Sequence, residues 1–194
     1  MKIVEIPPEW RRRAIVVRAE PLPLWWFSTE ELRAAERFKL DRRRDDFLLS
    51  RAAAKSLAME LGLARDPMEI RVEGRQIATR NVSLSHSSPY AAAAIDERPV
   101  GIDAQVIRDI SENAAHLFLT DAEIETMRSI DVPDRLIHFW CAKEAVWKRE
   151  GGSIATLRRV PLALEAVNET SLHFEDVDTL RLGDLVVALT RRVS

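Results

Sequence analysis

An internal repeat is the feature that most limits how this chain can fold. A shift of 92 positions aligns Ser28 with Thr120 and Glu31 with Glu123. Each hydroxyl and carboxylate has the spacing of a capping box, which satisfies the first backbone N–H groups of a helix. The same shift aligns further pairs: Leu32 with Ile124, Arg43 with Arg135, Phe47 with Phe139, Arg51 with Lys143, and Ala53 with Ala145. A duplicated pattern of this length predicts two similar halves.

The predicted fold class is therefore α+β, with two similar α/β halves related by a pseudo-two-fold axis. We place the N-terminal half at residues 1–98 and the C-terminal half at residues 99–194. Such an internal pseudo-dimer has a ligand cleft between its halves, a common place for a small-molecule site. The repeat breaks where Ala52 aligns with Glu144 and Ser56 with Lys148. The second half carries charges that the first half lacks, which indicates where the chemistry lies.

The helices and strands follow from the pattern of each segment. One helix is expected from Ser28 to about Lys39, and a longer one from about Arg42 to Leu61. Strands are expected at Ile15–Val17, Val82–Leu84, Tyr90–Ile95, Leu172–Phe174 and Leu185–Leu189.

A hairpin is expected in the middle of the chain. Residues 96–99 read Asp-Glu-Arg-Pro, which is typical of a turn. The segment Val100–Val106 then follows as the returning strand, paired with Tyr90–Ile95.

Composition excludes several classes of protein. Hydrophobic residues make up 46% of the 194 positions and charged residues 31%, a mixture typical of globular proteins. The net charge of -2 argues against a nucleic-acid binder. A single cysteine, Cys141, excludes both an intramolecular disulfide and a multi-cysteine zinc site. Because there is neither a membrane-spanning run nor a secretory signal, we expect a cytoplasmic protein without a membrane partner.

The segment Phe139–Lys148 carries the strongest chemical signal. At about 100° per residue, one arc of a helix gathers a carboxylate and two ammonium groups among aromatic rings. The members of this arc are Trp140, Lys143, Glu144, Trp147 and Lys148. Glu144 and Lys148 also have the spacing of an ordinary surface ion pair, and that alternative stays open at this point. The two tryptophans argue against it, because a solvated face seldom exposes both.

A second segment, Gly101–Gln105, reads as a strand. Asp103 and Gln105 then point to the same face, with their Cα atoms about 7 Å apart. Asp103 alone would most simply cap a turn. Together with Glu144 from a facing helix, it would suit a hard divalent cation such as Mg²⁺.

A third segment, Ser83–Ser87, places His86 among serines. It has no Gly-x-Ser-x-Gly elbow, which argues against a serine hydrolase. Arg51 and Arg75 belong to a set of basic residues upstream, and guanidinium groups bind phosphate well. No Walker loop is present to bind phosphates in another way.

These segments resemble the 4'-phosphopantetheinyl transferases of the larger, surfactin-synthetase-activating type. The family's Gly-x-Asp-x-Glu strand corresponds to residues 101–105, and its Trp-x-x-Lys-Glu-x-x-x-Lys helix to residues 140–148. Its Asn-x-Ser-His-Ser motif corresponds to residues 83–87, and the similarity extends over about residues 20–165. The family's two-half fold agrees with the repeat.

The resemblance implies an enzyme that transfers the 4'-phosphopantetheine arm of coenzyme A to a serine of an apo acyl or peptidyl carrier protein. The products are the holo-carrier and 3',5'-ADP. By position, Mg²⁺ is bound by Asp103, Glu144 and Gln105, while Glu144 and Lys148 are catalytic. Glu144 serves as the base, directly or through a metal-bound water. The implied coenzyme A contacts are Arg51, Arg75, Ser85, His86, Asp103, Lys143 and Lys148.

The sequence departs from the family pattern at the second strand carboxylate. Gln105 stands where the family has an acid, so one metal position offers only a neutral amide oxygen. An alternative is therefore a non-catalytic relative that binds coenzyme A or a carrier protein. The retained Asp103, Glu144 and Lys148 favour the enzyme. Because the duplication supplies both halves, we expect a monomer.

Overall fold

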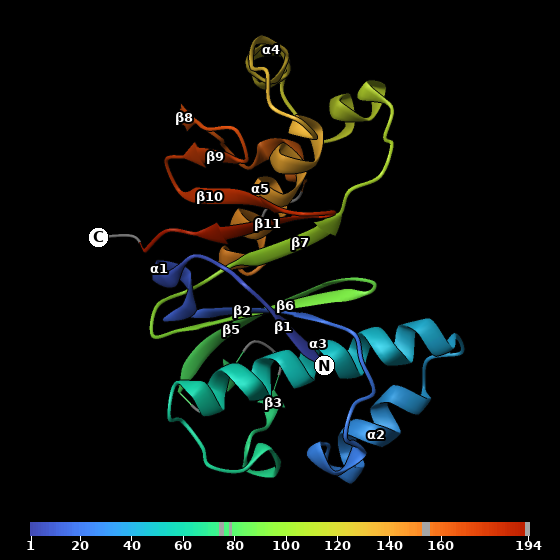
Figure 1. Ribbon diagram of the computed structural model, residues 1–194. Helices are drawn as coiled ribbons and strands as arrows, with labels where there is room; N and C mark the ends of the chain where they lie inside the picture. The colour runs from blue at the N-terminus through green and yellow to red at the C-terminus, as the bar shows by residue number, and fades with distance from the viewer. Residues whose placement is uncertain (74–75, 78, 153–155, 193–194) are drawn as a thin grey trace. The chain divides into compact units, whose positions relative to one another are not determined.

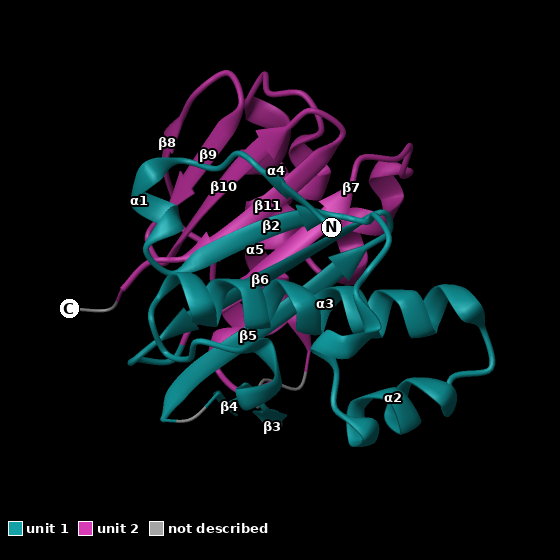
Figure 2. Ribbon diagram, turned by 60° about the horizontal axis from the view of Figure 1, so that its bottom comes forward, with its two compact units in different colours: residues 1–99 teal, residues 100–194 magenta. Residues whose placement is uncertain are grey.

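The chain forms two compact units, unit 1 with residues 1–99 and unit 2 with residues 100–194 (Figure 2). The computed structural model describes residues 1–73, 76–77, 79–152 and 156–192. Each unit combines an antiparallel sheet with helices, so the predicted α+β class is confirmed (Figure 1). Among the described residues, no helix is both long and apolar enough to cross a membrane.

Unit 1 is built on a six-stranded sheet in the order β1-β2-β6-β5-β4-β3, with the long helix α3 packed on β2, β5 and β6 (Figure 1). Apolar side chains of α3, such as Leu57, meet Ile15 and Ile95 of the sheet in a buried core. The elements are β1 (Lys2–Val4), α1 (Pro8–Arg11), β2 (Ala14–Arg18), η1 (Leu24–Trp26), α2 (Thr29–Glu36), α3 (Asp41–Glu60), η2 (Pro67–Glu69), β3 (Val72–Glu73), β4 (Gln76–Ile77), β5 (Arg80–Ser87) and β6 (Tyr90–Asp96), where η marks a 3₁₀ helix.

Unit 2 is built on a five-stranded sheet in the order β7-β11-β10-β9-β8, with α5 packed on β7, β10 and β11. Its core includes Phe139 of α5 and Phe174 of β9, whose rings meet edge to face at 5.1 Å. The elements are β7 (Ile102–Val106), η3 (Glu112–Leu117), α4 (Asp121–Ser129), α5 (Arg135–Arg149), η4 (Leu157–Arg159), β8 (Leu164–Val167), β9 (Ser171–Phe174), β10 (Val177–Leu182) and β11 (Leu185–Thr190).

The two units share one order of elements. From β2 in unit 1 and from β7 in unit 2, the chain continues into a short helix, a long helix and four consecutive strands that pair in sequence, while β1 and α1 come before this shared order. The last of these strands returns to pair with the first, β6 with β2 and β11 with β7. This shared order agrees with the internal duplication, while the pseudo-two-fold axis and the cleft between the halves stay predictions.

Both predicted capping boxes are present, and each one also binds a buried lysine of the long helix. The Glu31 carboxylate accepts from the Ser28 N–H and from Lys55 Nζ, the latter at 2.7 Å. In unit 2, the Glu123 carboxylate accepts from the Thr120 N–H. Lys143 Nζ donates to its two oxygens, Oε1 at 2.7 Å and Oε2 at 2.9 Å. One carboxylate thus begins the short helix and also ties it to the long helix.

The buried lysines correct the ungapped alignment within the long helices. Lys55 follows its glutamate by 24 residues, whereas Lys143 follows by 20. Lys143 is therefore the structural counterpart of Lys55, and the prediction that it corresponds to Arg51 was wrong. The reason is that α3 has 20 residues and α5 has 15, so α3 has extra residues before its lysine. In this register Ser56, rather than Ala52, corresponds to Glu144.

The predicted hairpin after Tyr90–Ile95 was wrong. The strand β6 pairs with β2 and β5, whereas β7 pairs with β11 in the other sheet. The turn is present, and Asp96 Oδ1 accepts from the Glu97 N–H at 2.8 Å. The chain passes from unit 1 into unit 2 there, and an apolar strand pattern does not specify which strand becomes its partner.

The other strand predictions at Ile15–Val17, Val82–Leu84, Leu172–Phe174 and Leu185–Leu189 are confirmed, as are the two helices of unit 1. The strands β8 and β10 were missed. Most of β8 is exposed, and β10 alternates polar with apolar residues, so neither contains an apolar run.

A buried histidine of α5 contacts the sheet of unit 2. His138 is fully buried, and its Nδ1 lies 2.7 Å from the Thr179 hydroxyl. The same hydroxyl accepts from the Leu172 N–H at 3.2 Å and lies 3.1 Å from the Leu172 carbonyl, so it joins His138 of α5 to β9 and β10. Burial, with a smaller contribution from Arg181, lowers the pKa of His138 from 6.5 to about 4. The folded protein therefore holds this ring neutral.

We predict that His138 makes unit 2 sensitive to acid. The unfolded chain binds a proton near pH 6.5 and the folded chain only near pH 4, so stability falls as the pH falls between these values. The loss attributable to His138 amounts to about 3 kcal/mol. Urea unfolding between pH 7 and pH 4 measures it, and His138→Asn should show a correspondingly smaller loss. Equal losses in both proteins would contradict the assignment.

We also predict that Lys143 is essential to the stability of unit 2. Lys143→Met leaves the Glu123 carboxylate buried without its ammonium and should cost about 3–5 kcal/mol, measured by urea unfolding. The double variant Lys143→Met/Glu123→Gln should recover part of the loss because the uncompensated charge is gone. Lys55→Met provides the matched change in unit 1. A loss below about 1 kcal/mol for Lys143→Met would show that the pair is dispensable.

Candidate functional site

Asp103 lies at the centre of a polar cluster in unit 2. It belongs to β7, and its side chain is buried, with 2% of its surface exposed. Gln105, two residues further along the same strand, donates from Nε2 to Asp103 Oδ2 at 3.2 Å. The two side chains thus share one face of the strand, as the alternation of strand residues requires.

Lys148 connects this strand to the last turn of α5. Its Nζ lies 2.7 Å from Asp103 Oδ1 and donates to the Ile102 carbonyl at 3.2 Å. The ion pair is shielded from water, because the side chain of Lys148 is 20% exposed and that of Asp103 only 2%. Such a pair in a low-dielectric setting is stronger than a surface pair.

A glycine allows β7 to approach α5 this closely. A Cβ built on Gly101 would lie 1.8 Å from the Ala145 carbonyl oxygen and 2.9 Å from the Arg149 nitrogen. No side chain fits in that space, so Gly101 is required by contact rather than by backbone conformation. The two helix residues in this contact, Ala145 and Arg149, directly follow Glu144 and Lys148 in the sequence. The contact therefore sets how far Asp103 lies from Glu144 and from Lys148.

Glu144 lies one helical turn before Lys148 and is half-buried. Burial raises the pKa of the Glu144 carboxyl above its ordinary value, and the negative charge of Asp103 raises it further, while Lys148 opposes the shift. The structure thus joins Asp103, Gln105 and Lys148 by hydrogen bonds and places Glu144 within electrostatic range of Asp103 and Lys148. The electrostatic contribution of Asp103 to Glu144 indicates two carboxylates that repel one another in a poorly hydrated place.

Lys143 does not lie in this cluster. It is fully buried on the neighbouring side of α5, and its Nζ donates to both Glu123 oxygens and to the Val160 carbonyl. An ammonium has three N–H donors, and all three are used there. The arc of α5 that carries the cluster is therefore narrower than predicted, and the expected contact of Lys143 with coenzyme A stays a prediction.

The remaining predicted site residues belong to unit 1. Ser85 and His86 are neighbours on β5 and point to opposite faces of the sheet, Ser85 buried and His86 exposed. His86 Nε2 lies 3.9 Å from Asp46 Oδ2 of α3. On the same helix the Arg51 guanidinium lies 3.4 Å from the centre of the Phe47 ring, and burial lowers the pKa of Arg51. Arg75 lies outside the described residues.

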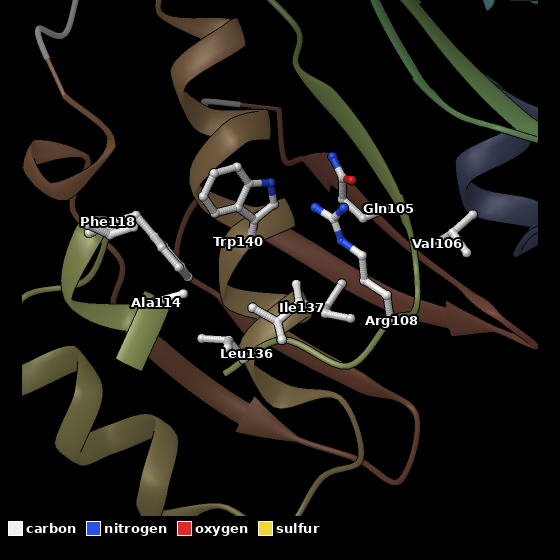
Figure 3. A pocket seen from close by; sticks show the side chains of 10 residues that line it. Gln105, Val106, Arg108, Ala114, Phe118, Leu136, Ile137 and Trp140 are labelled. Carbon is white, nitrogen blue, oxygen red and sulfur yellow. The ribbon is translucent and has the colours of Figure 1, made fainter. Parts of the chain in front are cut away.

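An apolar pocket that sequence reasoning missed begins beside Gln105. It is a cavity of about 170 Å³ in unit 2, and Figure 3 shows Trp140 of α5 facing Gln105 and Arg108 across it. The Phe118 ring meets Trp140 edge to face at 4.8 Å. The other lining residues are Val106, Ile110, Ala114, Leu117, Leu136 and Ile137. The signal in the sequence was Trp140 on the same helical arc as Glu144 and Lys148, because a solvated face seldom carries two tryptophans.

The donor set of the cluster fits a hard divalent cation. Asp103 and Glu144 offer carboxylate oxygens and Gln105 an amide oxygen, which are the ligands that Mg²⁺ prefers. Burial chiefly raises the pKa of Glu144 and the charge of Asp103 raises it further, and a cation bound here would favour the ionised carboxylate. The described residues contain no group of three or more His, Cys, Asp or Glu side chains placed to hold a metal. A metal bound here would therefore rest on two carboxylates, with water or substrate completing its shell.

The amino-acid sequence is similar to those of known proteins of one superfamily. Residues 99–189 match the sequence profile of the 4'-phosphopantetheinyl transferase superfamily. The 4'-phosphopantetheinyl transferase HetI of Nostoc sp. is 31% identical over 164 residues, which cover 75% of this chain and 68% of HetI. The 4'-phosphopantetheinyl transferase psf-1 of Bacillus pumilus is 31% identical over 66% of this chain and 59% of its own length. The 4'-phosphopantetheinyl transferase Sfp of Bacillus subtilis is 30% identical over 38% of this chain and 34% of Sfp.

The family predicted from the strand and helix motifs is thereby confirmed. The matched profile includes Asp103, Gln105, Glu144 and Lys148, the residues that the structure brings together. The chain belongs to the 4'-phosphopantetheinyl transferase superfamily and is an enzyme of that class.

Proposed function

We propose that this protein transfers the 4'-phosphopantetheine arm of coenzyme A to a serine of an apo acyl or peptidyl carrier protein, in a Mg²⁺-dependent reaction that releases 3',5'-ADP. The observation that carries the proposal is the cluster of Asp103, Glu144 and Lys148 in a chain of this superfamily. Two carboxylates and an ammonium are the groups that phosphoryl transfer needs for holding a metal and neutralising phosphate charge.

Asp103 and Glu144 would hold the metal, with the amide oxygen of Gln105 as a third, neutral ligand. When bound, Mg²⁺ supplies charge neutralisation on the pyrophosphate of coenzyme A. A neutral third ligand leaves the site less negative than three carboxylates would, so we expect weaker metal binding than at a fully acidic site.

The protein's own groups would move the proton and stabilise the leaving group. The serine oxygen forms a bond to the phosphorus that carries pantetheine, and the bond from that phosphorus to the bridging oxygen of 3',5'-ADP breaks. Glu144 accepts the serine proton, directly or through a water, and its raised pKa makes it a stronger base than an exposed glutamate. Lys148 neutralises charge on the phosphate oxygens.

The predicted phosphate contacts of unit 1 stay part of the proposal. Arg51, Ser85 and His86, with Arg75, would bind the 3'-phosphate of coenzyme A. Of the three described residues, His86 has the most exposed side chain. We further propose that the enzyme acts as a monomer.

The test is mass spectrometry of an apo-carrier protein incubated with this protein, coenzyme A and Mg²⁺. We predict a gain of one phosphopantetheine on the carrier serine. Glu144→Gln should lower kcat/KM by about 10²–10⁴, because it removes both a metal ligand and the base. The control is Glu125→Gln, which changes an exposed glutamate of α4 and should leave the rate unchanged.

Gln105→Glu separates the proposal from its alternative. If the protein is an enzyme, the unmodified protein transfers the arm to the carrier. Gln105→Glu should then lower the Mg²⁺ concentration needed for half-maximal transfer. No transfer to several carriers by the unmodified protein, followed by transfer after Gln105→Glu, would identify a binding protein one residue away from an enzyme. No transfer by either protein would refute the proposed activity on those carriers.

A further inference from the structure

Lys148 occupies the position at Asp103 where a cation would bind. Its Nζ lies 2.7 Å from Asp103 Oδ1, on a carboxylate that is almost completely buried. The other oxygen, Oδ2, accepts from the Gln105 amide at 3.2 Å. Asp103 therefore presents one oxygen to a neutral donor that holds the carboxylate in place, and the other to a positive charge.

A divalent cation on the same oxygen would repel the ammonium. Mg²⁺ binds carboxylate oxygens at about 2.0–2.1 Å. The Lys148 ammonium, which donates to that oxygen at 2.7 Å, would then lie within a few ångströms of a doubly charged cation, inside a poorly hydrated site. The two carboxylates Asp103 and Glu144 balance one divalent cation, which leaves no excess negative charge for Lys148.

The position of Lys148 on α5 allows its ammonium to move away from Asp103. It lies in the last turn of α5, which ends at Arg149, and its side chain keeps 20% of its surface exposed. Its second bond, to the Ile102 carbonyl, is the longer of the two at 3.2 Å. By contrast, Lys143 on the same helix is fully buried with all three donors used, so it has no comparable freedom.

We propose that Lys148 and a divalent cation exchange at Asp103 Oδ1. In the metal-free protein the ammonium stabilises the buried carboxylate. Metal binding replaces it there and releases Lys148 toward the substrate phosphate. This inference rests on the proposed function, and it adds that the same lysine is a counter-ion before metal binding and a phosphate ligand after it. Lys148 therefore lowers the metal affinity of the free protein, and substrate phosphate restores that affinity by drawing the lysine away.

The first test is Mn²⁺ binding to the full chain without coenzyme A, followed by the electron paramagnetic resonance signal of free Mn²⁺. Because exchange makes the ammonium and the metal competitors, Lys148→Met should bind Mn²⁺ about tenfold more tightly than the unmodified protein. The control is Arg128→Met, which removes a positive charge from the exposed pair with Glu112 and should leave Mn²⁺ affinity unchanged. Unchanged or weaker binding by Lys148→Met would overturn the proposal, as would a lack of Mn²⁺ binding by both proteins.

The second test needs no variant. Amine-selective labelling of the unmodified protein, read by mass spectrometry of its peptides, reports how accessible each lysine is. We expect Mg²⁺ to increase the labelling of Lys148 several-fold and to leave Lys143 unlabelled. Labelling of Lys148 that does not change, or that falls with Mg²⁺, would overturn the exchange. Neither test measures transfer, so the exchange can fail while the carrier protein is modified, and it can hold while no carrier protein is modified.

Discussion

The buried ion pair between Lys143 and Glu123 sets the orientation of α5, and the site of unit 2 depends on that orientation. An ammonium with no contact to water must keep its carboxylate and carbonyl partners, because leaving any of them unpaired costs several kcal/mol. The rotation of α5 about its axis is therefore fixed at Lys143. Glu144 follows at about 100° around the helix and Lys148 lies one turn further, so both face β7. Unit 1 contains the same device in Lys55 and Glu31, without acidic or basic chemistry one residue later, since Ser56 occupies that position.

The distance between helix and strand is set separately, by Gly101. Its missing side chain lets the β7 backbone touch the α5 backbone at Ala145, which is why an ammonium from the helix reaches a carboxylate of the strand at 2.7 Å. The ion pair of Lys143 and Glu123 sets the rotation of α5, and the Gly101 contact sets the distance between α5 and β7. Together these two contacts define the geometry of the cluster. A cluster of side chains held by backbone contact and by a buried ion pair keeps its geometry without help from flexible loops.

Features encoded over short stretches could be predicted from the sequence. The capping boxes, the long helices and the common face of Asp103 and Gln105 each depend on spacings of two to four residues. The placement of Lys143 could not be predicted, because its partners Glu123 and Val160 lie 20 and 17 residues away, and helical periodicity alone assigns it to the face of Glu144. The partner of β7 was missed for a similar reason: strand β11 lies near the other end of unit 2, and an apolar pattern carries no information about pairing. The apolar pocket at Trp140 needed Phe118 and Ile110, whose proximity follows only from the folded chain.

The replacement of an acid by Gln105 changes the electrostatics more than the geometry. A glutamate there would put a third negative charge beside two carboxylates that already share one ammonium, and would raise the pKa of Glu144 further. The amide instead donates to Asp103 Oδ2, so it satisfies that buried oxygen while adding no charge. With an amide at position 105, the cluster has two carboxylates and one ammonium rather than three carboxylates and one ammonium. The Lys148 ammonium pairs with the other oxygen, Oδ1, at 2.7 Å, so the amide and the ammonium together hold the Asp103 side chain in place.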